Sequence, residues 1–283
     1  MGVSTGALTL SAPSRAMGAK LFHQTWMPST PPHAILILAH GYAEHLGRYD
    51  YFARRCNNVG LAVFALDHWG HGNSDGEPGY VPSFSIFLDG MAALLSHARA
   101  TCPGLPRVLI GHSMGGLIGA SHLLTHQDGY AAAVLSGPAV QPGTPPSAAT
   151  RVIGRLLSKL APHAGLIQLD ATAISRDPDV VARYLEDPLV HKGKMSARMA
   201  AEMLDAMEHL QANAGQIRIP LLIAHGSEDK LAAAEGGRRL SDLVSSTDKE
   251  FRLLKGMYHE IFNEPERDDV IDGVLSWIDQ RIS

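Results

Sequence analysis

The sequence has few cysteines and no long hydrophobic run, which argues against a disulfide-stabilised or membrane-spanning chain. Cys56 and Cys102 are the only cysteines among 283 residues, and two cysteines so far apart favour free thiols in a reducing compartment. Residues 1–20 have neither a basic start nor an apolar core, so we expect no signal peptide. No apolar run approaches the ~20 residues of a transmembrane helix. We expect a protein that is cytoplasmic or peripherally attached to a membrane.

Charge is scarce as well and nearly balanced. Charged residues make up 18% of the chain and the net charge is -4, so nothing in the composition favours nucleic acid as a partner. The hydrophobic content of 45% is typical of a globular protein, and a chain of this length can bury a large core. The sequence has no internal repeat and no low-complexity segment. This length fits one large α/β domain with an insertion, or two small domains.

Short apolar runs alternate with helical patterns through the first half of the chain. The runs without a polar residue are interpreted as buried strands at 34–39, 62–66, 108–110 and 131–135. The intervening patterns predict helices over 49–58, 85–99 and 114–126. Such an alternation is typical of a parallel sheet with helices on both faces. We therefore predict an α/β fold with a mostly parallel sheet, preceded by an antiparallel edge strand over 21–27.

The alternation stops between Pro138 and about Gln216. This stretch opens with four prolines and becomes helical and methionine-rich, as seen from Pro138, Pro142, Pro145, Pro146, Met195, Met199, Met203 and Met207. Strand and helix patterns resume at 220–224, 250–254 and 268–281. Because an unstructured loop of that length is unusual, we predict a helical cap over 138–216, inserted between two parts of one core, 1–137 and 217–283.

The strongest chemical motif is the G-x-S-x-G sequence of residues 111–115. It lies between a predicted strand and a predicted helix, where it is typical of a nucleophile elbow that exposes a serine hydroxyl. Gly111 and Gly115 have no Cβ, so the strand and the helix can approach closely around the turn. The alternative is a serine in an ordinary glycine-rich loop, and the placement between a strand and a helix argues against it. We predict that Ser113 is a nucleophile.

A nucleophilic serine needs a base, and the base needs an orienting acid. Asp229 and His259 each follow a predicted strand, and ligands of open α/β sheets bind at the carboxyl ends of the strands. We predict Asp229 as the acid and His259 as the base. Glu228 is an alternative acid. His225 is an alternative base, although its place in the same loop as Asp229 favours packing beside the site.

Backbone amides are expected to stabilise the oxyanion of the tetrahedral intermediate. One donor should be the amide of Met114, at the N-terminus of the helix that follows the elbow. The other should be the amide of Tyr42, in the loop after the first buried strand. His68 and His71 are three residues apart without a third ligand, which is weak evidence for a metal site. We predict no metal and no organic cofactor.

Several motifs together resemble the monoacylglycerol lipases, within the serine-hydrolase branch of the α/β-hydrolases. The resemblance runs from about Lys20 to Ile282, is close to bacterial and especially actinobacterial members, and is carried by residues 40–49, 67–74, 111–116, 184–189, 226–229 and 258–259. It implies the α/β-hydrolase fold and the same triad and oxyanion donors. It also implies that Glu44, Arg48 and Tyr184 lie near the glycerol end of the substrate, although they could equally form structural hydrogen bonds.

One helical pattern of the cap is amphipathic. Val152, Ile153, Leu156, Leu157 and Leu160 recur at helical spacing, and three cations lie on the other side, Arg151, Arg155 and Lys159. Two interpretations remain open. In the first, the apolar face packs on the core and the charged face is solvated. In the second, the apolar face contacts lipid while the cations meet anionic head groups, which would give peripheral membrane contact through the cap.

These patterns lead to one expected function and its alternatives. We expect a serine hydrolase that cleaves monoacylglycerols to glycerol and free fatty acid through an acyl-enzyme, with a lipid ester as the substrate. Lysophospholipase or general carboxylesterase activity differs only in pocket contacts. A non-catalytic receptor on the same fold is the alternative from another class, and the complete triad argues against it. The oligomeric state stays open.

Overall fold

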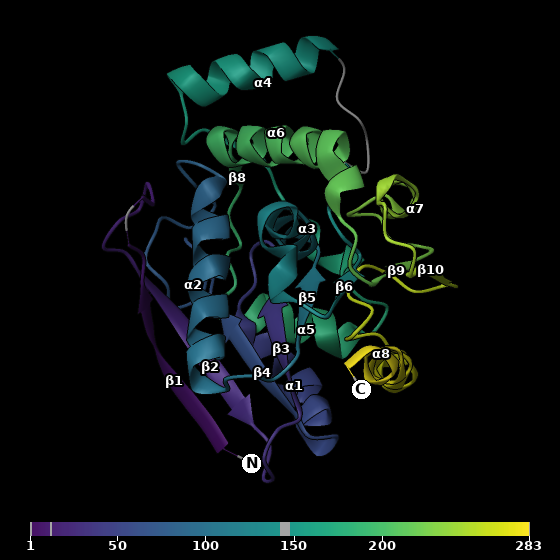
Figure 1. Cartoon of the computed structure of the whole chain (residues 1–283). Coiled ribbons are helices and arrows are strands. Elements are labelled where there is room, and N and C mark those ends of the chain that lie inside the picture. The colour runs from purple at the N-terminus through teal and green to yellow at the C-terminus, as the bar shows by residue number, and fades with distance from the viewer. Residues whose placement is uncertain (1, 12, 142–147, 283) are drawn as a thin grey trace.

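Eight strands form one mixed sheet through the middle of the protein (Figure 1). The computed structural model describes residues 2–11, 13–141 and 148–282. The strand order is β1-β2-β4-β3-β5-β6-β9-β10, in which β1 and β2 are antiparallel to their neighbours and the others are parallel. The bounds are β1 Gly2–Thr9, β2 Lys20–Met27, β3 Ala34–Ala39, β4 Leu61–Leu66, β5 Arg107–His112, β6 Ala132–Ser136, β9 Leu221–Gly226 and β10 Lys249–Leu254.

The outer strand of the sheet differs from the prediction. The strand predicted over 21–27 is β2 and is antiparallel, but it does not lie at the edge. Strand β1 pairs with it along its whole length, from Gly2 opposite Met27 to Thr9 opposite Lys20. The β1 sequence is small and weakly apolar, and its side chains are mostly exposed, so it lacks the periodicity by which a strand is recognised in sequence.

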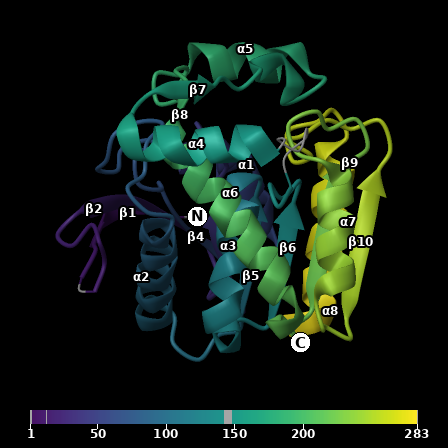
Figure 2. The same cartoon turned by 90° about the horizontal axis from the view of Figure 1, so that it is seen from above.

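Helices cover both faces of the sheet (Figure 2). One face carries α2 Ser85–Thr101, α3 Met114–His126 and α7 Ala234–Leu243, and the other carries α1 Asp50–Asn58 and α8 Arg267–Ile282. Short 3₁₀ helices occupy Leu46–Tyr49, Gln127–Gly129, Ala171–Ala173 and Ala214–Gln216. This is the predicted α/β-hydrolase arrangement, a mostly parallel sheet between two helical layers.

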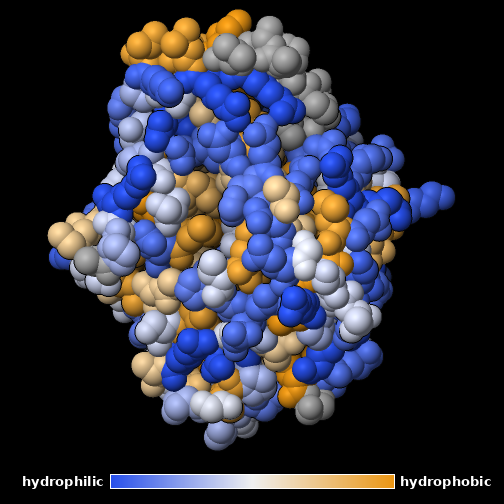
Figure 3. Space-filling view, turned by 45° about the horizontal axis from the view of Figure 1, so that its top comes forward, coloured by the Kyte–Doolittle hydropathy of each residue, from blue (hydrophilic) through white to orange (hydrophobic). Residues whose placement is uncertain are grey.

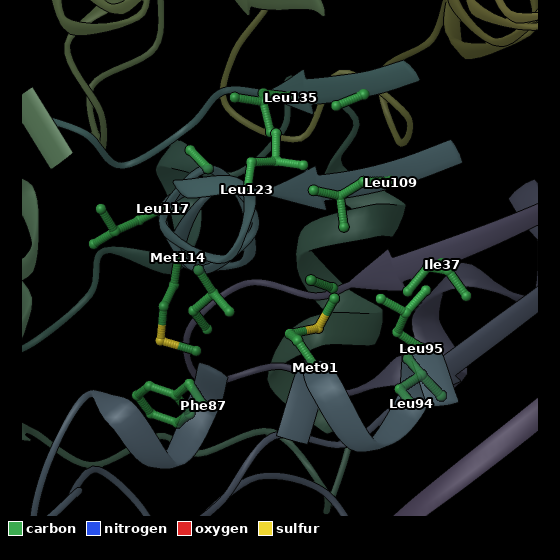
Figure 4. Packing of buried hydrophobic residues seen from close by; sticks show 14 of the residues in the cluster. Ile37, Phe87, Met91, Leu94, Leu95, Leu109, Met114, Leu117, Leu123 and Leu135 are labelled. Atoms are coloured by element: carbon green, nitrogen blue, oxygen red, sulfur yellow. The ribbon is translucent and has the colours of Figure 1, made fainter. Parts of the chain in front are cut away.

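Alternating residues of each central strand supply two separate cores. In β3, Ile35 and Ile37 face the core under α2 and α3, whereas Leu36 and Leu38 face the core under α1 and α8. Figure 4 shows the first core, where side chains of α2 and α3 close over the strands. Burial on both faces explains why these strands are continuously apolar rather than alternating.

The segment between β6 and β9, which we call the cap, stands above the carboxyl edge of the sheet. It contains α4 Ala148–Leu160, β7 Gly165–Ile167, α5 Pro178–Glu186, β8 Met195–Ser196 and α6 Ala197–Asn213. Helix α4 lies on α6, and α6 in turn contacts α3. Three of the prolines at the start of the predicted cap, Pro142, Pro145 and Pro146, lie outside the described residues. The boundaries of the cap as a unit stay a prediction.

Helix α4 is oriented with its apolar face outward. Ile153, Leu156 and Leu160 are 57%, 54% and 75% exposed, and Figure 3 shows hydrophobic side chains at the top of the molecule, over this helix. Arg151 and Arg155 face the other way and pair with Glu208 and Asp205 of α6. The interpretation in which the apolar face packs on the core is therefore wrong, because charge pairing turns the opposite side toward the protein.

The search for membrane-crossing helices covers only the described ranges. Within them, no helix combines the length and the apolar character that a bilayer-spanning segment needs.

The turn at Ser113 depends on a close contact between α3 and β3. A Cβ added at Gly115 would overlap the carbonyl oxygens of Ala39 and His40, and one added at Gly111 would overlap the Gly115 carbonyl. All of these are backbone atoms, which cannot swing aside. The two glycines thus let the helix start directly over the ends of β3 and β5.

We expect Gly115→Ala to lower the free energy of unfolding by about 2–3 kcal/mol, because α3 would have to move away from the sheet. Urea denaturation followed by circular dichroism measures this change. Gly154→Ala is the matched control, since Gly154 is helical and no atom lies near its added Cβ; it should gain up to about 1 kcal/mol from helix propensity. Equal stabilities for the two variants would contradict the contact.

Candidate active site

Ser113 sits in a strained turn between β5 and α3. Its φ of 53° and ψ of -117° are rare for a residue with a side chain, and such strain persists only where the surroundings hold it. The Ser113 amide donates to the Ser136 carbonyl of β6 at 3.0 Å, and the Ser113 carbonyl accepts from the amides of Gly116, Leu117 and Ala139. Four backbone hydrogen bonds therefore fix the predicted nucleophile above the sheet.

Asp229 and His259 come together above the carboxyl ends of β9 and β10. His259 Nδ1 lies 2.6 Å from Asp229 Oδ2, and both side chains are buried. The other Asp229 oxygen accepts from the amides of Leu231 and Ala232, at 2.8 and 3.0 Å. The carboxylate is thus held from two sides, and its bond to Nδ1 leaves His259 Nε2 as the free ring nitrogen.

The alternative acid and base lie elsewhere in this region. His225 is fully buried with Nε2 3.1 Å from Asp229 Oδ2, the oxygen that His259 Nδ1 also contacts, so it packs beside the Asp229–His259 pair, as the sequence suggested. The hydrogen bond of the Glu228 side chain is with Ser227 Oγ, at 3.3 Å. Neither residue lines the main cavity beside Ser113.

The charges around His259 favour its protonated form. Burial by itself lowers the pKa of His259, but the adjacent Asp229, through its charge and its hydrogen bond, and then Glu260 and Glu44, raise it above the ordinary value. Burial by itself raises the pKa of Asp229, but His259, His225 and the Ala232 amide lower this pKa below its ordinary value. Asp229 is therefore ionised, and His259 holds a proton firmly once it receives one.

The loop after β3 lies against the turn at Ser113, since a Cβ added at Gly41 would be 3.3 Å from the Ser113 Cβ. His40 Nε2 accepts from the His68 amide at 3.0 Å, so Nδ1 carries the ring proton and donates to the Gly41 carbonyl at 2.8 Å. In a trans peptide the N–H points opposite to the carbonyl, so this bond aims the Tyr42 amide. Met114 is the first residue of α3, and its amide precedes the hydrogen-bond ladder of the helix.

A cavity of about 990 Å³ joins these groups to the cap. Tyr42, Ser113, Met114 and His259 line its floor. The cap contributes apolar walls, among them Leu166, Ile167, Met195, Met203, Leu204 and Met207. The volume is at the upper end of the roughly 300–1,000 Å³ of ligand pockets. Charged residues of α4 and α6, among them Arg155 and Glu208, also line the cavity, so it offers both apolar and polar surface beside Ser113.

Glu44, Arg48 and Tyr184 form a separate buried cluster. Arg48 lies between Glu44 and Glu260 and stacks 4.8 Å from the centre of the Tyr184 ring. None of the three lines the main cavity, whereas Arg48 borders a second cavity of about 260 Å³ together with His45. Contact of these residues with glycerol stays a prediction.

Two residues of this region were assigned no role from the sequence. His112 is buried with its ring 4.8 Å from that of His259, and burial, followed by the charge of His259, lowers its pKa to about 4. Glu260 directly follows His259 and receives two hydrogen bonds from Arg48. Their positions next to Ser113 and His259 in the chain were the available signal, but adjacency in sequence does not show which way a side chain points.

A mostly parallel sheet under a cap, with a strained serine and a buried Asp–His pair at one cavity, defines a serine hydrolase of the α/β-hydrolase fold. A family model described as "Serine aminopeptidase, S33" matches residues 30–266. The chain is 42% identical to "Monoacylglycerol lipase" of Mycolicibacterium smegmatis, covering 92% of this chain and 93% of that protein. It is 33% identical to the human "Monoglyceride lipase", covering 94% and 89%.

Structure comparison agrees with these relatives. The crystal structure of the Paleococcus ferrophilus monoacylglycerol lipase aligns with a TM-score of 0.82 and 31% identity, covering 91% of this chain and 98% of that one. The chain therefore belongs to the monoacylglycerol lipase family of serine hydrolases.

The raised pKa of His259 predicts how Ser113 reacts with a fluorophosphonate. The base must be neutral to accept the serine proton. Labelling should therefore slow as the pH falls through the pKa of His259, which lies above the ordinary value of about 6.5. Asp229→Asn removes the group that raises this pKa, so the residual rate should fall off at a lower pH. Stopped labelling reactions resolved by intact-protein mass spectrometry measure both profiles, and a labelling rate unaffected by acid would contradict the assignment.

Proposed function

We propose that this protein hydrolyses monoacylglycerols to glycerol and a free fatty acid through an acyl-enzyme on Ser113. The observation that carries the proposal is the hydrogen-bonded Asp229–His259 pair, which opens on the same cavity as the strained Ser113. The names of its relatives support the choice of monoacylglycerols.

In the acylation step, the Ser113 oxygen attacks the ester carbonyl while His259 Nε2 takes the hydroxyl proton. The amides of Tyr42 and Met114 stabilise the oxyanion that forms. The carbon–oxygen bond to glycerol then breaks, and the departing alkoxide takes the proton from His259. Asp229, ionised throughout, holds the imidazole and stabilises its protonated form.

Deacylation repeats these steps with water. His259 accepts a proton from a water molecule, which attacks the acyl-enzyme carbonyl, and a second tetrahedral intermediate forms at the same two amides. Its collapse returns the proton to Ser113 and releases the fatty acid. All of the proposed proton transfers involve His259, in agreement with a pKa raised toward neutrality.

We expect Ser113→Ala to lower turnover of a monoacylglycerol by several orders of magnitude without loss of folding. For the wild type, kcat/KM should rise with acyl length by up to about fourfold per methylene, since a buried CH₂ contributes about 0.8 kcal/mol, until the cavity is filled. A panel of mono-, di- and triacylglycerols, lysophosphatidylcholine, p-nitrophenyl esters and an aminoacyl anilide measures this by fatty-acid or chromophore release.

The panel also separates the alternatives. Preference for lysophosphatidylcholine would make the protein a lysophospholipase, and preference for short esters a general carboxylesterase. Full activity in Ser113→Ala would contradict the mechanism itself. No labelling by a fluorophosphonate, together with no turnover, would favour a receptor.

We further propose that the cap contacts lipid surfaces through its outward apolar face. Elsewhere in the cap, Leu166 and Ile167 of β7 are also exposed and belong to the cavity lining. A lipid that enters the cavity beside β7 would therefore meet exposed apolar side chains first. Peripheral attachment follows from this proposal, and a cytoplasmic location stays a prediction.

Ile153→Ser/Leu156→Ser/Leu160→Ser should reduce binding to phosphatidylcholine vesicles by at least about tenfold, because the lost contacts are apolar. Cosedimentation of the Ser113→Ala protein measures this. Val59→Ser/Leu243→Ser, which alters exposed apolar residues outside the cap, is the control and should bind normally. Arg151→Ala/Arg155→Ala should also bind normally, because these cations pair with α6. A larger loss in the arginine variant, confined to anionic vesicles, would instead favour head-group binding.

A further inference from the structure

Glu44 is a buried carboxylate that holds the loop of the predicted oxyanion site from behind. Its Oε1 accepts from the Gly41 amide at 2.6 Å and from the Tyr49 hydroxyl at 2.7 Å. Its Oε2 accepts from Arg48 Nη1 at 2.6 Å. Burial alone raises the pKa of Glu44, but Arg48, His112 and these hydrogen bonds lower it net. The carboxylate is therefore ionised, and these three hydrogen bonds to it all come from groups of the protein.

The Arg48 guanidinium joins this loop to the loop of the predicted base. Nη1 and Nη2 donate to the two oxygens of Glu260 at 2.6 and 2.8 Å, and Glu260 directly follows His259 in the chain. Asn263 donates to the same carboxylate at 2.8 Å, and the Glu260 amide donates to the Ile174 carbonyl. Arg48 is thus paired with a carboxylate on each side, one from each catalytic loop.

The loop after β3 has a strained backbone that the hydrogen bonds of Glu44 help to hold. Ala43 has a φ of 68°, a left-handed conformation that costs a residue with a side chain about 1 kcal/mol or more. The Gly41 amide is fixed by Glu44, and the peptide that carries the Tyr42 amide is fixed at its carbonyl by His40. Loss of Glu44 would leave His40 as the side chain that orients this peptide.

We propose that Glu44, Arg48 and Glu260, the ion clamp, set the Tyr42 amide and His259 at the separation that the tetrahedral intermediate requires. Glu44 and Glu260 are then positioning residues of acyl transfer rather than groups that touch the substrate. The inference rests on the proposed use of Ser113, His259 and the Tyr42 amide, but not on the choice of monoacylglycerols.

The charge of the clamp also acts on the base. His259 faces Asp229, Glu260, Glu44 and the ring of His112, and His225 contacts the same Asp229 oxygen as His259. Glu260→Gln removes one of the negative charges that raise the His259 pKa. The acid limb of kcat/KM should therefore move to lower pH. A loss of folding alone would lower the amount of active enzyme without moving this limb.

The test compares Glu44→Ala, Glu44→Gln and Glu260→Gln with the wild type, using monooleoylglycerol and p-nitrophenyl butyrate. A long-chain trifluoromethyl ketone, which adds Ser113 to form a stable tetrahedral adduct, reports binding of the intermediate. For Glu44→Ala we expect kcat to fall by about 10²-fold, comparable to the loss of one oxyanion donor. KM should change less than about twofold, and the inhibition constant of the ketone should rise with the fall in kcat.

The conservative variant and a matched control separate positioning from stability. Glu44→Gln keeps an oxygen that accepts from the Gly41 amide, so it should recover most of kcat. Glu264→Gln alters another buried carboxylate, which pairs with Arg176 away from the cavity, and it should reduce thermal stability while leaving kcat and the pH profile unchanged.

The outcomes distinguish the two proposals. A wild type that hydrolyses neither ester and resists a fluorophosphonate would refute the proposed function. Activity toward p-nitrophenyl butyrate alone would contradict monoacylglycerols as the substrate, and the variants would then test the clamp with that ester. An active wild type beside a folded Glu44→Ala with unchanged kcat and ketone affinity would overturn the clamp. If Glu44→Ala does not fold, a folded Glu260→Gln with unchanged kcat, unchanged ketone affinity and an unshifted acid limb would overturn it.

Discussion

The structure depends on how closely α3 approaches the ends of β3 and β5. Gly111 and Gly115 allow backbone to lie against backbone there, and the turn between them holds Ser113 in a strained conformation. The hydrogen bonds of Ser113 to β6 and to the residues after it hold this turn in place. The position of Ser113 is thus set by main-chain packing. The other groups of the site are arranged around this serine.

The other groups reach the serine because parallel strands end at one edge. The loops after β3, β9 and β10 bring Tyr42, Asp229 and His259 to that edge, and buried charges then lock the loops together. Asp229 is fixed by two amides and two imidazoles. Arg48 ties the first loop to the last through Glu44 and Glu260. Packing supplies the approximate arrangement, and hydrogen-bonded ions supply the accuracy that proton transfer needs.

Much of this arrangement could be predicted from the sequence because the signals are local. Continuous apolar runs marked the central strands, and the glycines around Ser113 marked the turn. Strand β1 was not predicted, because small residues such as Gly2, Ser4 and Gly6 give no alternation of apolar and polar side chains. The direction of α4 escaped because its pattern is the same whichever face points inward; the acidic residues of α6, some fifty positions later, decide it. Glu260 escaped for the same reason, since its partner Arg48 is 212 residues away.

The outward apolar face of α4 also affects the behaviour of the protein in water. If two such faces met in the absence of lipid, they would bury the same surface that a bilayer would cover under the proposed lipid contact. Detergent or lipid monomers would then compete for that surface. The number of chains per particle is therefore expected to depend on the amphiphile in the solution as well as on protein concentration, so that the state of assembly reports how the cap is covered.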